Sequence, residues 1–157
     1  MRHRVPEVVP RILVLTLLLP GGTALATGDA CDLLTTAEVN KLVSPSLHPG
    51  QHLSSSNKTV CGWSVSNPPK QEEPRLAVAI KTLESFNTGK GLKELKPEPI
   101  TGVGDEAWFS TLGSGGTTLS VRKGDRAFSV KVLGSKLKLE DLKLLEKNLA
   151  LLIVPRL

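Results

Sequence analysis

Aromatic residues are scarce in this sequence of 157 residues. It holds two Trp, three Phe and no Tyr, which together make 3% of the chain. A surface that stacks bases on interleaved aromatic rings is therefore poorly supplied, and nucleic-acid binding is disfavoured. Histidine is also rare, with three residues, which leaves few side chains for general acid–base chemistry near neutral pH.

Long hydrophobic runs and dense cysteine patterns are missing as well. Two cysteines exclude a disulfide-rich miniprotein, and a hydrophobic content of 39% argues against a wholly disordered chain. No apolar run reaches the ~20 residues that a membrane-spanning helix needs. The length fits one domain, or one domain with an appendage.

The appendage is at the N-terminus, where residues 1–26 have the order of a secretory signal peptide. A segment with three arginines precedes an apolar run over residues 12–19, and Ala24-Leu25-Ala26 supplies the small residues of a cleavage site. We predict cleavage after Ala26 and export of residues 27–157, as one domain, to the periplasm or the medium. Because residues 1–26 hold three of the 20 basic and one of the 15 acidic residues, the exported chain has a net charge of +3.

Both cysteines, Cys31 and Cys61, lie in the exported part. An even pair in an oxidising compartment predicts a disulfide between them. Lipidation of Cys31 is disfavoured, because Gly28-Asp29-Ala30 lacks the leucine-like residue that a lipoprotein signal places three positions before its cysteine. A zinc site built on two cysteines is also disfavoured, since no further cysteine completes it.

Local patterns predict the elements of an α+β fold. Thr35 and Glu38 form a capping box for a helix that runs to about Val43, before a polar loop over residues 44–58. The segment 83–95 is either a weak helix or a loop, because Gly89 and Gly91 interrupt it. Alternating apolar residues predict strands over residues 59–65, 75–81 and 106–111.

A hairpin and a closing helix complete the pattern. A two-residue turn at Gly124-Asp125 places Val121 opposite Phe128, so that turn chemistry and hydrophobic register agree. A helix from about Leu139 to Ile153 follows, with an apolar stripe on one side. We therefore expect an antiparallel sheet of about five strands, with N-terminal and C-terminal helices packed on one face and one disulfide.

Three short motifs carry a resemblance. The chain has Cys31-Asp32-Leu33-Leu34-Thr35 at the start of a capped helix, then Cys61-Gly62-Trp63, then Gly102-Val103-Gly104-Asp105-Glu106-Ala107. In these it resembles a family of small bacterial exported proteins and lipoproteins, mostly actinobacterial, that is classed as a domain of unknown function. The likeness covers most of residues 30–154. It implies export, a disulfide and an α+β fold of the kind shared by PsbP-like proteins, and it implies no catalytic residues.

Candidates for chemistry are few. His48 and His52 are the histidines of the exported part, and Pro49 and Gly50 between them argue against a helix that would bring them together. They are weak candidates for a metal site, and either could be the base of a cell-envelope hydrolase with a dispersed site. The motif over residues 102–107 matches the outline of a dinucleotide fingerprint, but a strand follows it where a helix is required. We expect no cofactor.

Binding is the function that the sequence favours over catalysis. Arg122, Lys123, Arg126 and Lys131 gather on the hairpin and form a candidate patch for an anion or an acidic partner. The sequence therefore predicts an exported binding or interaction domain, whose partner is an envelope polymer or another envelope protein. The alternatives are the hydrolase and a weak metal-binding protein that uses His48 and His52.

Overall fold

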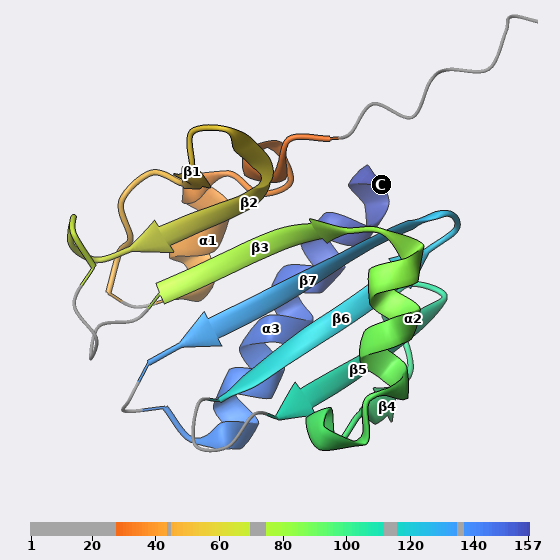
Figure 1. Ribbon diagram of the computed structural model, residues 1–157. Coiled ribbons are helices and arrows are strands. Elements are labelled where there is room, and N and C mark those ends of the chain that lie inside the picture. Colours follow the sequence, from red (N-terminus) through yellow and green to blue (C-terminus); the bar gives the residue numbers. More distant parts are fainter. Residues whose placement is uncertain (1–27, 44, 70–74, 112–115, 135–136) are drawn as a thin grey trace, which may run out of the picture.

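The computed structural model describes residues 28–43, 45–69, 75–111, 116–134 and 137–157 (Figure 1). The predicted signal peptide and its cleavage site lie outside these ranges. Within them, no helix is both long enough and apolar enough to cross a membrane. The described chain forms an α+β fold around one antiparallel sheet.

Within the described residues, seven strands make up the sheet, in the order β1-β2-β3-β7-β6-β5-β4. The predicted strands are all present, and two of them have the predicted bounds. The strands are β1 (Gln51–Ser54), β2 (Asn57–Ser64), β3 (Arg75–Lys81), β4 (Glu98–Ile100), β5 (Glu106–Thr111), β6 (Thr117–Lys123) and β7 (Arg126–Leu133).

The expectation of about five strands was too low, because it did not include the two edge strands, β1 and β4. β1 lies in the segment predicted as a polar loop, and its residues are mostly exposed, so no alternation of apolar residues marks it. Pairing with β2, for example of His52 with Cys61, creates it. β4 has three residues and includes Pro99, a residue that sheets accept at an edge because it donates no backbone hydrogen bond.

The predicted hairpin is confirmed in turn and register. β6 pairs with β7 so that Val121 faces Phe128 and Leu119 faces Val130. Gly124, the first residue of the turn, has φ +59°, a conformation that glycine adopts without a steric cost. All four paired apolar side chains are buried in the main core.

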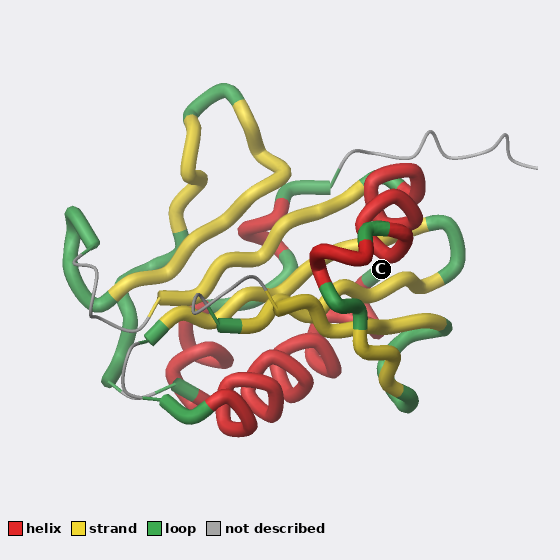
Figure 2. The backbone as a smooth tube through the Cα atoms, turned by 60° about the horizontal axis from the view of Figure 1, so that its bottom comes forward, coloured by secondary structure: helices red, strands yellow, loops and turns green. Residues whose placement is uncertain are grey.

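Two helices cover one face of the sheet. α1 (Thr36–Leu42) has the predicted capping box between Thr35 and Glu38, and α3 (Leu139–Ile153) has the predicted bounds. Both lie on the same side of the sheet (Figure 2). Their apolar residues, among them Val39, Leu149 and Ile153, belong to the main core.

The third helix corrects the expected arrangement. α2 (Leu83–Gly91) is formed in the segment predicted as a weak helix or a loop, and it lies on the opposite face of the sheet (Figures 1 and 2). Its buried residue Phe86 packs on Trp108 and Ala127 in a small second core. A Cβ atom at Gly89 would lie 3.1 Å from the Trp108 ring. This glycine therefore permits the close approach of the helix, although it weakens the helix signal in the sequence.

Candidate functional site

The predicted disulfide is present and joins two elements near the N-terminus of the described chain. Cys31 lies in the short 3-10 helix η1 (Ala30–Asp32) and is bonded to Cys61 of β2. Cys61 is fully buried in the main core. The bond therefore attaches η1 directly to the sheet.

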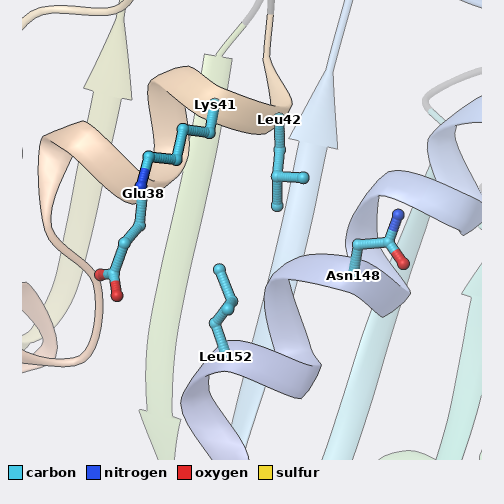
Figure 3. A pocket seen from close by; sticks show the side chains of 5 residues that line it. All are labelled: Glu38, Lys41, Leu42, Asn148 and Leu152. Carbon is cyan, nitrogen blue, oxygen red and sulfur yellow. The ribbon is translucent and has the colours of Figure 1, made fainter.

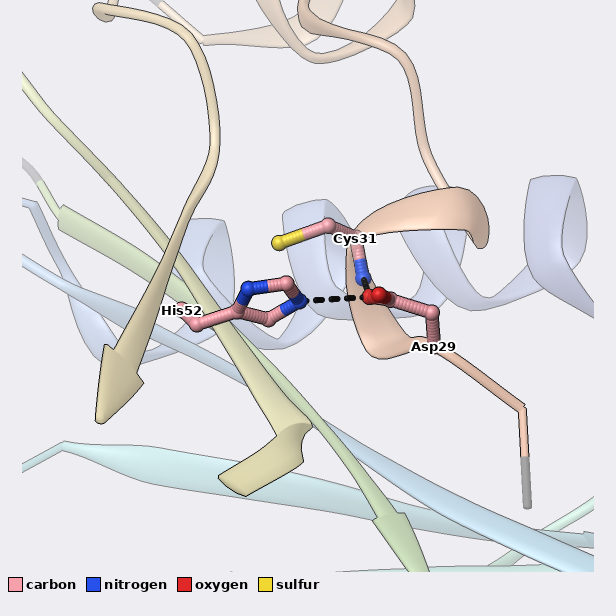
Figure 4. Close-up of side chains that lie close together, drawn as sticks. All are labelled: Asp29, Cys31 and His52. Atoms are coloured by element: carbon pink, nitrogen blue, oxygen red, sulfur yellow. Dashed lines mark hydrogen bonds and ion pairs between the residues drawn. The ribbon is translucent and has the colours of Figure 1, made fainter. Parts of the chain in front are cut away.

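Asp29 and His52 lie beside this disulfide. Asp29 is the N-cap of η1, and its Oδ1 accepts a hydrogen bond from the Cys31 N–H at 2.9 Å. The same oxygen lies 2.6 Å from His52 Nε2 (Figure 4). The hydrogen bond with His52 is the main cause that holds the pKa of Asp29 below its usual value. The carboxylate therefore orients the imidazole and stays ionised.

The two candidate metal-binding histidines are not brought together as a site. Donor atoms of Asp29, Cys31 and His52 all lie within 4.8 Å of one another, and His48 is outside this group. His48 is exposed, and its backbone N–H donates to the Ser64 carbonyl. The sequence missed Asp29 as the neighbour of His52 because 23 residues separate them.

A groove lies between α1 and α3, on the face of the sheet that these two helices cover. Its volume is about 410 Å³, and its lining comes from both helices (Figure 3). Leu42 of α1 and Leu152 of α3 point into the space between the helices. The other lining residues are Glu38, Lys41 and Asn148.

The polar groups of the groove differ in what they already bind. Glu38 bonds Arg156 and the cap residue Thr35, and the hydrogen bond with Arg156 is the main cause that lowers its pKa to about 2. Among the described residues, neither the Lys41 ammonium nor the Asn148 amide has an ion-pair or hydrogen-bond partner. Of the described residues that line the groove, the Lys41 ammonium and the Asn148 amide are thus free to bind a partner.

Exposed leucines continue the groove across the outer side of α3. The exposed fraction is 38% for Leu42, 59% for Leu144 and 44% for Leu151. Leu144, Asn148 and Leu151 are spaced by four and three residues, so they share one side of the helix. We call Leu42, Leu144, Asn148, Leu151 and Leu152 the leucine surface.

The sequence contains a signal for this surface, namely leucines of α3 that lie outside the predicted apolar stripe. A helix with one buried side needs leucine on that side only. In α3, the side with Leu142 and Leu149 is buried, and leucines also occupy the opposite side. The excess of leucine over what the core requires points to a second contact surface.

The four basic residues of the hairpin are divided between the two faces of the sheet. Lys123 and Arg126 form the pair that follows Val121 and Phe128 on the same face of the hairpin, the face of the main core. Arg122 and Lys131 alternate with the core residues along their strands, so their side chains point to the other face. Arg122 Nε is 3.3 Å from Glu106, and Lys123 Nζ is 2.8 Å from Asp105. Two of the four charges are therefore paired, and the role of the patch as a binding site stays a prediction.

Comparisons of the chain with protein-family models, with curated proteins and with solved structures find no match. The resemblance to a family of small exported bacterial proteins stays a prediction.

Proposed function

We propose that the protein is an exported binding domain that holds an apolar, acidic segment of a partner protein on its leucine surface. The observation that supports this most is the exposure of Leu42, Leu144 and Leu151, at 38%, 59% and 44%, around one groove. Large apolar side chains that gather on a surface are typical of interaction sites. Export itself rests on the signal-peptide pattern of residues 1–26.

The charge of the groove selects the chemistry of the partner. Glu38 is already neutralised by Arg156, so the carboxylate at the rim repels an acidic partner less than a free one would. Lys41 is available to pair with a carboxylate, and Asn148 can donate or accept hydrogen bonds. An apolar segment that carries acidic residues complements these groups better than a basic segment does.

The open shape of the surface favours a protein segment as the occupant. Small-molecule sites enclose most of their ligand within a concave pocket. Here the groove between Leu42 and Leu152 leads to Leu144 and Leu151 on the exposed side of α3. A helix or strand of a partner can cover both the groove and this side, as amphipathic segments do in other apolar grooves.

The runner-up function is a hydrolase that uses His52 as its base. The hydrogen bond that His52 donates to the Asp29 carboxylate favours it, since a carboxylate orients the imidazole in many catalytic sites. In the part of the chain that the structure describes, however, no serine or threonine hydroxyl bonds to His52. Binding on the leucine surface has the stronger support.

Site-specific photo-cross-linking in cells that produce the protein tests the proposed function. The Asn148→p-benzoylphenylalanine variant carries the cross-linker in the groove, and the Thr88→p-benzoylphenylalanine variant carries it on the exposed side of α2, at the opposite face. We expect one protein to be cross-linked from position 148 only. Mass spectrometry should place the link in a segment of that protein that contains both apolar and acidic residues.

Two further variants decide the outcome. Leu151→Lys and Lys41→Glu, each combined with the cross-linker at position 148, should abolish the product. A lipid adduct at position 148, equal products from positions 148 and 88, or products that survive both substitutions would overturn the proposal.

A further inference from the structure

Asp29, Cys31 and His52 form a cluster of three potential metal ligands, and the disulfide joins Cys61 to Cys31. Cys31 Sγ lies within 4.8 Å of donor atoms of both Asp29 and His52. Cys61 Sγ is bonded to Cys31 Sγ, and Cys61 lies directly opposite His52 in the register of β1 and β2. Three separate elements, η1, β1 and β2, hold the four residues in place.

We propose that Asp29, Cys31, His52 and Cys61 bind a zinc ion when the Cys31–Cys61 disulfide is reduced. Two thiolates, one imidazole and one carboxylate are all ligands that zinc takes, and four ligands complete the tetrahedral shell of a structural site. The zinc site that the sequence analysis disfavoured for want of further cysteines thus obtains its remaining ligands from a histidine and an aspartate.

The oxidised and reduced states differ in the number of ligands they offer. With the disulfide intact, both sulfur atoms are bonded to each other and carry no negative charge, so Asp29 and His52 are the remaining strong donors. Thiolates, not disulfide sulfurs, are the ligands that hold zinc tightly. Tight binding therefore requires the reduced state.

A dithiol is the reductant that opens the Cys31–Cys61 disulfide. The dithiol transfers two electrons and two protons to the Cys31–Cys61 bond. The dithiol becomes a disulfide, and Cys31 and Cys61 become free thiols. Zinc binding then forms two Zn–S bonds and releases two protons from these thiols. Oxidation reverses both steps and releases the ion, so that the site couples metal binding to the redox state.

The position of the cluster at the surface gives the ion a path of entry. Cys61 is fully buried, but the side chains of His52 and Asp29 are 29% and 22% exposed. An ion can therefore approach from the side of His52 and reach the sulfur atoms behind it. His52 Nε2 lies 2.6 Å from the Asp29 carboxylate, so the two donor groups already face each other beside Cys31.

Titration of the full chain with Co²⁺, followed by displacement with Zn²⁺, tests the site. The protein is used oxidised and after reduction with tris(2-carboxyethyl)phosphine. We expect the reduced protein to bind one Co²⁺ and to show the visible bands of a tetrahedral ion together with thiolate charge-transfer absorption. The oxidised protein should show neither signal.

Substitutions distinguish the proposed site from binding by two cysteines alone. His52→Ala and Asp29→Asn should weaken binding by about tenfold or more and alter the spectrum, in line with the usual effect of losing a group at a metal site. His48→Ala, which changes the exposed histidine four residues away, should leave both unchanged. Equal binding by the His52→Ala and His48→Ala variants would contradict the proposal.

Folding of the reduced chain is followed in the same samples by circular dichroism. If reduction unfolds the protein, one equivalent of zinc should restore the native spectrum in the His48→Ala variant and fail to do so in the His52→Ala variant. A reduced protein that neither binds Co²⁺ nor regains its fold with zinc would overturn the inference.

Discussion

The Glu146 carboxylate accepts a hydrogen bond from the backbone N–H of Val132, at 3.0 Å, where Glu146 is fully buried. On one side, Val132 pairs with Leu76 of β3. On the other side, the register of β6 and β7 ends at the pair of Leu119 with Val130. The side chain of Glu146 therefore supplies an acceptor that β6 no longer provides, and it attaches α3 to the end of β7.

The burial of this carboxyl predicts that the protein loses stability as the pH rises to neutral. Burial raises the pKa of Glu146 from its usual 4.5 to about 7, so between these values the folded protein keeps a proton that the unfolded chain releases. The free energy of unfolding should fall across this range by about 3 kcal/mol. Urea unfolding at a series of pH values between 4 and 8 measures it.

The Glu146→Gln variant is the control for that pH dependence. Glutamine keeps an oxygen that can accept from Val132 N–H, but it does not ionise. The decline in stability between pH 4.5 and 7 should therefore be much shallower in the variant. Parallel curves for the two proteins would show that Glu146 is not the group responsible.

Arg156 should stabilise the fold by joining the C-terminus to the start of α1. Its Nη1 donates to the Leu33 carbonyl at 2.8 Å and to Glu38 Oε2 at 3.1 Å, and its Nη2 bonds Glu38 Oε1. We expect Arg156→Ala to lower the free energy of unfolding by about 1 kcal/mol at neutral pH. Arg126→Ala, which removes an arginine without an ion pair among the described residues, should have a smaller effect.

The same contact has a pH dependence of opposite sign to that of Glu146. Since Arg156 lowers the pKa of Glu38 to about 2, the contribution is present above about pH 4.5 and is lost as the pH falls toward 2. Arg156→Ala should make the loss of stability in this acid range less steep. An unchanged acid profile in the variant would refute this role.

Gly104 should tolerate substitution less well than Gly102, although both lie in the Gly102-Val103-Gly104 motif. Both have positive φ, +83° for Gly102 and +61° for Gly104. A Cβ at Gly104 would lie 2.5 Å from the Arg122 carbonyl oxygen, whereas a Cβ at Gly102 meets nothing within 4 Å. Gly102→Ala should cost about 1–2 kcal/mol from backbone strain alone, and Gly104→Ala clearly more. Equal melting temperatures for the two variants would contradict the steric argument.

The disulfide should account for a large share of the stability. It closes a loop with a sequence separation of 30 residues, which corresponds to about 3.5 kcal/mol in the chain-entropy model. The Cys31→Ser/Cys61→Ser double variant should lose roughly that amount in urea unfolding with a metal chelator present. Mass spectrometry of the unreduced protein should show the two cysteines linked, and two free thiols would contradict the bond.

The charge preference of the groove can be tested with peptides. We expect a synthetic leucine-rich helix with glutamates to shift the NMR signals of Lys41 and Asn148, and the same helix with lysines in place of the glutamates to bind more weakly. Lys41→Glu should reverse this order. If the two peptides bind equally to both proteins, charge does not select the partner.

Several elements could be predicted from the sequence because their signals are local. The capping box of Thr35 and Glu38 needs four consecutive residues, and the turn at Gly124 fixes which residues of β6 and β7 face each other. The bounds of α3 follow from its leucine pattern and from Pro155 beyond it. Predicting the disulfide required only the two cysteines and the expectation of an oxidising compartment.

Other features could not be predicted because they depend on residues far apart in the chain. β1 carries no apolar alternation and exists by pairing with β2. α2 packs closely on Trp108 at the second face of the sheet, and the absence of a side chain at Gly89 permits this contact. A glutamate in a leucine-rich helix is expected to face solvent, but Glu146 is buried because it lies against β7.

The candidate sites divide in the same way. The sequence by itself determined that few residues are available for catalysis, that the cysteines form a pair, and that α3 has more leucine than one buried side requires. Only the tertiary structure decided that Asp29 and His52 stand beside the disulfide and that Leu42 faces Leu152 across a groove. The physical reason is that local propensity selects helices and strands, whereas the packing of η1 on β2 and of α1 beside α3 selects which side chains meet.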